Sequence, residues 1–188
     1  MMPPALDLEA WRLVLAVGTF LAAVHAYRKL SPYFAITWFG AALVFAYLSS
    51  GGPAEPERVL LPGLVFYLSA AVTKGLVETR NGVRGNHVVH VIMTGLFGGL
   101  LALPIEAAAR VERWPMPMAS RGPLWGVGDA LGGVPLDVVV AWCLAATLFY
   151  GTYKVLDHIG LGKPLQTVLL FASMPLLAIG LERLRAMI

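Results

Sequence analysis

Carboxyl groups in and around the stretch GGVPLDVVVAW are the first residues whose types suggest chemistry. Asp137 lies about one turn inside this otherwise apolar stretch, Asp129 precedes it, and Glu106 ends the apolar block before it. A carboxyl group in apolar surroundings favours its protonated form and can protonate an alkene, whereas a carboxylate can accept a proton from water. We therefore name all three as candidate catalytic residues. A structural alternative exists for Asp137, because Pro135 suits the first turn of a helix and an acid there complements the helix dipole.

Histidines and two further acids form a second group, which we expect at the opposite side of the protein. His87 and His90 are three residues apart in GNHVVHV, so they share a face of a helix. Neutral imidazoles with carboxylates could bind zinc or iron, and two histidines from different helices could ligate a haem. Strong metal-binding spacings such as HExxH are missing, and histidines at helix ends are also ordinary interfacial residues. The candidate metal ligands are His25, His87, His90, His158, Glu78 and Asp157.

The composition decides which kind of element must position these groups. Of 188 residues, 58% are hydrophobic and 13% are charged, whereas an average soluble domain carries about 25% charged residues. The net charge of +3 does not indicate a nucleic-acid partner, because the basic residues are scattered singly at the ends of apolar blocks. We expect a single integral membrane domain, residues 1–188, in a prokaryotic inner (plasma) membrane.

Six apolar blocks are each close to the roughly 20 residues that cross a bilayer as a helix. They are continuously apolar, unlike barrel strands, and helices satisfy their own backbone in lipid. The prediction is an all-α polytopic membrane helix bundle. Gly95, Gly98 and Gly99 let helices approach closely, and such faces could support a homo-oligomer. The expected helices are Trp11–Tyr27, Phe34–Ser50, Val59–Val77, Val88–Ile105, Leu136–Tyr153 and Leu165–Leu181.

The longest stretch outside these helices, from Arg110 to Pro135, is rich in tryptophan, proline and glycine. Tryptophan prefers the membrane interface, where its ring is in an apolar medium and its N–H stays wet. We expect an irregular interfacial segment before helix five that covers a cavity; the alternative is an ordinary interfacial loop. Candidate substrate-binding residues are Trp114 and Trp125 in this segment and Trp142 in the helix that follows.

The run from Gly133 to Leu136, followed by Trp142, resembles the GVPL-x5-W pattern of the membrane carotenoid-biosynthesis hydratases, the bisanhydrobacterioruberin hydratase type. In that family a glutamate ends the preceding helix, and a stretch rich in glycine, proline and aromatic residues leads into GVPL. Glu106 and the run RGPLWGVGDALG stand at the corresponding places, and the resemblance covers roughly residues 104–145. This chain departs from the pattern because it is shorter, has fewer helices, and lacks a tyrosine-rich run before GVPL.

The resemblance implies a long polyene or other isoprenoid substrate in the bilayer, with water added across a terminal C=C bond. It predicts an intramembrane enzyme acting on a lipid or carotenoid-like substrate by acid-catalysed hydration or isomerisation, a hydratase-like lyase. Two alternatives stay open: a metal- or haem-dependent membrane protein that uses the histidines, and a small non-enzymatic transporter or membrane assembly subunit. The expected partner is a membrane lipid or a hydrophobic small molecule.

Overall fold

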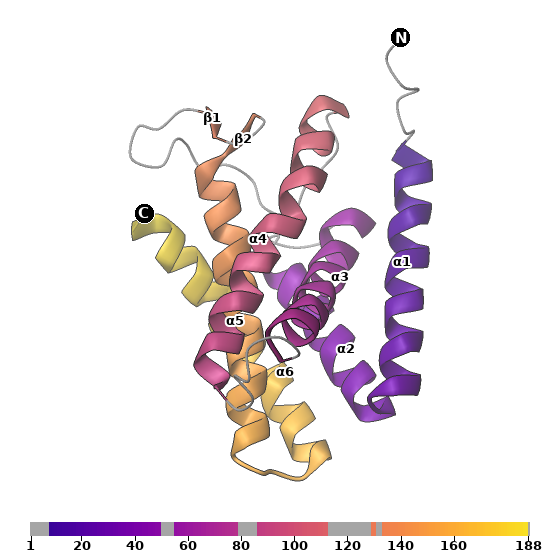
Figure 1. Cartoon of the computed structure of the whole chain (residues 1–188), viewed down its shortest axis with the longest axis vertical. Coiled ribbons are helices and arrows are strands. Elements are labelled where there is room, and N and C mark those ends of the chain that lie inside the picture. Colours follow the sequence, from indigo (N-terminus) through magenta and orange to yellow (C-terminus); the bar gives the residue numbers. More distant parts are fainter. Residues whose placement is uncertain (1–7, 50–54, 79–85, 113–128, 131–132, 188) are drawn as a thin grey trace.

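The computed structural model describes residues 8–49, 55–78, 86–112, 129–130 and 133–187 (Figure 1). Within these residues the chain forms six α-helices, one π-helical turn and one two-stranded ribbon. This confirms the predicted all-α bundle. The elements are α1 (Leu8–Lys29), α2 (Pro32–Ser49), α3 (Pro56–Thr73), η1 (Lys74–Glu78), α4 (His87–Glu112), β1 (Asp129–Ala130), β2 (Val134–Pro135), α5 (Leu136–His158) and α6 (Lys163–Met187).

All six α-helices are long and apolar enough to cross a membrane, judged by length and composition. Large apolar side chains point outward from them, including Leu13, Phe20, Leu96 and Leu176. An apolar outer surface of this kind suits lipid as the surrounding medium. Helix α4 continues seven residues beyond the predicted end at Ile105. The segment EAAARVE consists mostly of strong helix formers, but its three charged residues interrupt the apolar block that was used to place the end.

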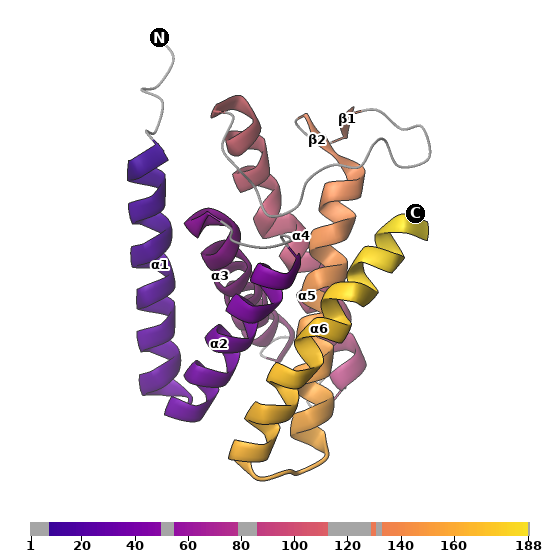
Figure 2. The same ribbon diagram turned by 180° about the vertical axis from the view of Figure 1, so that it is seen from behind.

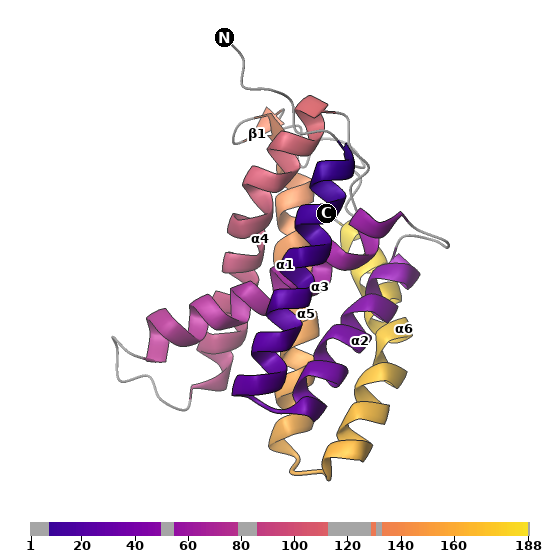
Figure 3. The same ribbon diagram turned by 90° about the vertical axis from the view of Figure 1, so that its right-hand side faces the viewer.

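Successive helices alternate in direction, so that the bundle has two distinct ends (Figures 1 and 2). At one end, which we call the lysine end, α1, η1 and α5 finish and α2, α4 and α6 begin. At the other, the Glu106 end, α4 finishes and β1 and β2 lead into α5. Helix α1 contacts only α2 and α3 among the larger interfaces, and it lies beside them in Figure 3.

The most extensive helix contact joins α4 to α5. Gly95, Gly98 and Gly99 of α4 face α5, and a Cβ atom at any of them would collide with Thr147, Ala146 or Cys143 respectively. The absent side chains let the two backbones approach closely, which confirms the expectation drawn from these glycines. This close contact fixes how residues on α4 meet residues on α5.

Of the segment from Arg110 to Pro135, which was expected to be irregular, the structure describes residues 110–112, which belong to α4, and the two short strands with Gly133. Asp129 pairs with Pro135 and Ala130 with Val134 in an antiparallel register, and Gly133 occupies the intervening turn with φ of 83°. A positive φ favours glycine because it has no Cβ. Pro135 lies one residue outside α5 as its N-cap, rather than inside the first turn as expected, while Asp137 does lie in that turn. Residues 113–128 and 131–132 fall outside the described residues.

Candidate functional site

The three candidate acids differ in burial and in surroundings at the Glu106 end. The Glu106 side chain on α4 is only 1% exposed, and Trp142 on α5 donates a hydrogen bond from Nε1 to Glu106 Oε1 over 2.8 Å. Asp137 is partly exposed at the start of α5. The backbone of Asp129 belongs to β1, and its side chain lies outside the described set. The structure therefore brings together one predicted acid and one predicted aromatic residue.

Two of the three tryptophans predicted to bind substrate, Trp114 and Trp125, lie outside the described residues. Trp142 is fully buried. Its ring contacts Phe66 at a centroid distance of 6.3 Å, and its indole N–H is used by Glu106. Trp142 therefore positions the carboxyl group of Glu106 and also belongs to the aromatic core.

The predicted histidine ligands are distributed over three places. His87 and His158 approach one another with ring centroids 5.7 Å apart. His25 Nδ1 lies 2.6 Å from the Tyr67 hydroxyl, and His90 is buried on α4. Asp157 pairs with Lys163, and the side chain of Glu78 is outside the described set. In the part of the chain that the structure describes, no three His, Cys, Asp or Glu side chains gather into a group that could hold a metal ion.

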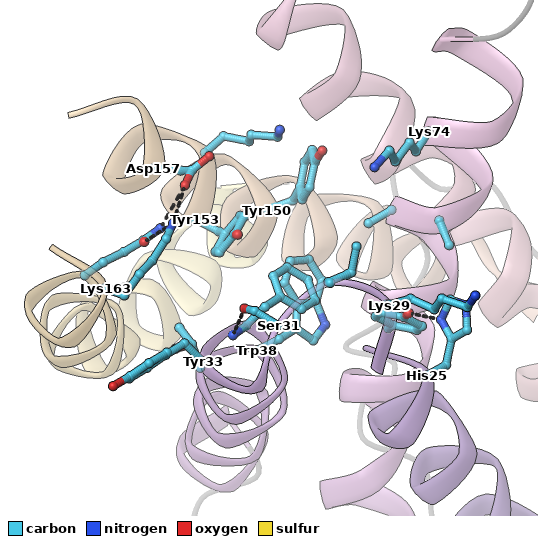
Figure 4. Close-up of a pocket in the computed structure, with 18 of the residues that line it drawn as sticks. His25, Lys29, Ser31, Tyr33, Trp38, Lys74, Tyr150, Tyr153, Asp157 and Lys163 are labelled. Carbon is cyan, nitrogen blue, oxygen red and sulfur yellow. Dashed lines mark hydrogen bonds and ion pairs between the residues drawn. The ribbon is translucent and has the colours of Figure 1, made fainter. Parts of the chain in front are cut away.

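A pocket of about 760 Å³ lies at the lysine end and is lined by α1, α2, α3, η1, α5 and α6 (Figure 4). Its volume falls in the range of about 300–1,000 Å³ that is typical of small-molecule sites. All four lysines of the chain line it: Lys29, Lys74, Lys154 and Lys163. So do six aromatic residues: Tyr33, Phe34, Trp38, Tyr67, Tyr150 and Tyr153.

Local sequence signals position the walls of this pocket. Ser31 caps α2, since its Oγ accepts a hydrogen bond from the Phe34 backbone N–H over 2.9 Å, and Pro32 follows at the first helical position. Both residue types are favoured at these places. After α5, Gly160 adopts φ of 73°, which turns the chain back into α6. The two turns bring the starts of α2 and α6 next to the end of α5.

Charges in the pocket are unevenly distributed. Lys163 pairs with Asp157 over 3.1 Å and donates to Gln166 over the same distance. Lys154 lies over the Tyr150 ring, 5.6 Å from its centroid, a distance at which a cation and an aromatic face attract. Asp157 is the only acidic residue among the lining residues that the structure describes. The pocket is therefore strongly cationic and suits an anionic group.

Trp38 is the central aromatic residue of the pocket wall. It is fully buried, it stacks on Phe34, and its ring edges meet Tyr150 and Tyr153. Its Nε1–H is buried, and no residue within the described ranges accepts a hydrogen bond from it. Buried donors are almost always paired in folded proteins, so an orphaned donor at a pocket requires an explanation. Since this N–H has almost no accessible surface, the ring serves as an apolar wall of the pocket.

A column of aromatic rings connects the two ends. Trp38 contacts Phe149 and Phe149 contacts Phe66, each pair with centroids 5.0 Å apart. Phe66 then contacts Trp142, which binds Glu106. These four rings are fully buried. The column fills the space between the two regions with closely packed side chains and keeps the pocket separate from Glu106.

The pocket was not predicted from the sequence. Of its lining residues, only His25 and Asp157 were named as candidate site residues, and both were assigned to a metal site. The positions of the lysines could have indicated it. All four lie near helix ends, and the alternating helix directions place these ends on the same side of the bundle. Tyrosines spaced along three different helices gave no comparable signal.

The comparisons with known proteins give no assignment: no protein-family model, no curated protein and no solved structure matches this chain.

Proposed function

We propose that the protein is an integral membrane protein, in the plasma membrane of a prokaryote, that binds an amphipathic lipid or isoprenoid in the pocket at the lysine end and acts on it. The observation that carries this proposal is a single pocket in which aromatic walls and all four lysines of the chain occur together. Aromatic walls favour an apolar chain, and the cationic rim favours a polar or charged head. A ligand with both parts is an amphiphile.

The position of the pocket supports the same conclusion. It lies where helices finish and begin, at the end of apolar spans. Lysine side chains near such ends extend their charged groups towards the interface while their methylene stems stay in apolar surroundings. A lipid that enters from the bilayer would find its head at the lysines and its chain against the aromatic rings.

Substitution of a tyrosine in the pocket tests this proposal. Tyr33 lines the pocket on α2, whereas Tyr47 lies near the other end of the same helix and is similarly exposed. We expect Tyr33→Ala to weaken binding of a brominated isoprenoid alcohol, measured by quenching of tryptophan fluorescence in nanodiscs. Tyr47→Ala is the matched control and should leave the affinity unchanged. Equal effects of the two substitutions, or no binding by the unmodified protein, would refute the proposal.

A second candidate function is acid-catalysed hydration of an isoprenoid C=C bond at Glu106. Its support is the hydrogen bond from Trp142 to a carboxyl group that is otherwise enclosed by α4 and α5. In the proposed step Glu106 transfers its proton to the terminal alkene carbon, a tertiary carbocation forms, and water adds to it. The oxygen-bound proton then returns to the carboxylate, so that the sum is alkene plus water to tertiary alcohol.

Glu106→Gln tests this second function, because the amide keeps an acceptor oxygen for Trp142 but cannot supply the proton. We expect it to abolish conversion of an acyclic polyene to its hydrate, detected by mass spectrometry as the gain of one water. Glu9→Gln serves as the control, since Glu9 is an exposed carboxylate at the start of α1 and was not named as a candidate acid. Undiminished turnover by the Glu106→Gln protein would exclude Glu106 as the acid.

A further inference from the structure

The lysine pocket contains more positive charge than a neutral or singly charged lipid head requires. Four lysines line it against one carboxylate, that of Asp157. That carboxylate is engaged by Lys163 at 3.1 Å, so one ion pair is already complete without a ligand. The charge that remains belongs to Lys29, Lys74 and Lys154.

Figure 4 shows how these charges are arranged around the pocket. Lys29, Lys74 and His25 lie on one side, and Asp157 with Lys163 lies on the other. Trp38 occupies the region between the two groups. The cationic side is formed by the end of α1 and by η1, and it has no acidic residue among the lining residues that the structure describes, which do not include the side chain of Glu78. An anionic head would therefore settle near Lys29 and Lys74.

Trp38 forms the wall between these two groups. It lines the pocket and is fully buried, and its Nε1–H has almost no accessible surface. The charged donors that the pocket presents are therefore the lysine ammonium groups, each with three N–H donors. An occupant that satisfies several of them must carry several acceptor oxygens.

We propose that this pocket binds an amphiphile whose head is a phosphomonoester or diphosphate, with Lys29 and Lys74 as the groups that select the head. The inference rests on the proposed binding of an amphiphile in the same pocket. A phosphomonoester carries a charge of about −1.5 to −2 near neutral pH and three strong acceptor oxygens. Lysine binds phosphate as a point charge. A carboxylate or a phosphodiester carries one negative charge and would leave part of the cationic side uncompensated.

The test compares three probes with the same C15 chain: farnesol, farnesyl phosphate and farnesyl diphosphate. Each is titrated into the full-length protein in nanodiscs of zwitterionic lipid. We expect the two phosphorylated probes to bind at least about tenfold more tightly than farnesol, because charge-assisted hydrogen bonds are about twice as strong as neutral ones. Inorganic pyrophosphate is titrated separately, to distinguish a lipid head from a free phosphate.

One double variant and a control assign the selectivity to residues. The Lys29→Gln/Lys74→Gln protein should bind farnesyl diphosphate about tenfold more weakly and farnesol with unchanged affinity, because glutamine stays polar but carries no charge. Arg28→Gln is the control, since Arg28 is an exposed cation next to Lys29 that does not line the pocket. It should change the affinity for farnesyl diphosphate less than about threefold.

Each outcome has a distinct meaning. If farnesol and farnesyl diphosphate bind equally and the lysine variants have no effect, the headgroup inference is wrong while the proposed amphiphile site stands. If no C15 probe binds, the proposed function itself fails. If inorganic pyrophosphate binds as tightly as farnesyl diphosphate, the site is one for free phosphate, and the lipid assignment is overturned.

Discussion

At one end of the bundle charged side chains line an open pocket, and at the other a single carboxyl group is enclosed against an indole. Four lysines at the first end retain access to solvent or ligand, and only Lys163 has an acidic partner within the described residues. Glu106 at the second end is 1% exposed and is held by Trp142 at 2.8 Å. Both arrangements place ionisable groups at the rim of an apolar bundle, but in opposite ways.

The two environments suit different kinds of interaction. Exposed cations interact through long-range attraction that salt screens, which suits capture and release of a charged molecule. An enclosed carboxyl group depends on short, oriented contacts, and loss of its one described hydrogen-bond partner leaves polar atoms unsatisfied. The aromatic column from Trp38 to Trp142 separates the two environments. Four measurements test this contrast between the two ends.

The largest effect is expected for Gly98→Leu. A side chain there would collide with Ala146 of α5, so the variant should lose about 3 kcal/mol of stability through overpacking. The Glu106–Trp142 pair spans the same two helices and should be disrupted first, whereas α4 does not line the pocket. Unfolding of the protein in detergent measures the loss. Gly180→Leu is the control, because nothing lies within 4 Å of a Cβ there; equal stability of the two variants would contradict the close α4–α5 contact.

A smaller effect is expected from removing the indole donors at the two ends. Trp142 and Trp38 are both fully buried, so Trp→Phe removes the same volume at each. Trp142→Phe also removes the hydrogen-bond donor to Glu106, whereas the N–H of Trp38 has no described acceptor. Trp142→Phe should therefore lower the free energy of unfolding by about 2 kcal/mol more than Trp38→Phe does. The free energies of unfolding of both variants, measured without added ligand, make the comparison. Equal costs would show that the Glu106 hydrogen bond contributes nothing.

Ionic strength should separate the two ends without any substitution. Raising NaCl from about 0.05 to 0.5 M shortens the screening length several-fold. The affinity of the lysine pocket for farnesyl diphosphate should then fall about fivefold, because the lining lysines are partly exposed. Turnover that depends on Glu106 should stay constant with a neutral polyene, since that carboxyl group is enclosed. A salt-independent affinity would argue against charge as the source of binding.

The smallest effect is expected for Asp157→Asn. Asp157 and Lys163 are 40% and 57% exposed, so breaking their ion pair should change stability by less than about 1 kcal/mol. Release of Lys163 adds positive charge to the pocket and should raise the affinity for farnesyl diphosphate about twofold. Glu9→Gln is the control, because it breaks the exposed Glu9–Arg12 pair far from the pocket. A fall in affinity would mean that Asp157 itself contacts the ligand.

Much of the fold and part of the site could be predicted from the sequence. The six spans were predicted because long apolar blocks have few other ways to satisfy their backbone. Gly95, Gly98 and Gly99 predicted a close approach of helices, but only the structure shows that α5 is the helix they contact. The importance of Glu106 followed from a carboxyl group at the end of an apolar block. Its partner Trp142 is 36 residues away, and no pattern along the chain favours this pair over Asp137 with Trp142.

The amino-acid sequence was sufficient to predict the lipid surroundings, the number of membrane spans and the side of the bundle at which each helix ends. Only the tertiary structure decided which face of each helix points inward. On α2, Trp38 is fully buried and Ile36 is 63% exposed, yet this helix carries apolar residues on all of its faces. In water an apolar stripe would mark the inner face. Because lipid is as apolar as the protein interior, that signal vanishes, and the pocket appears only once six helices are packed together.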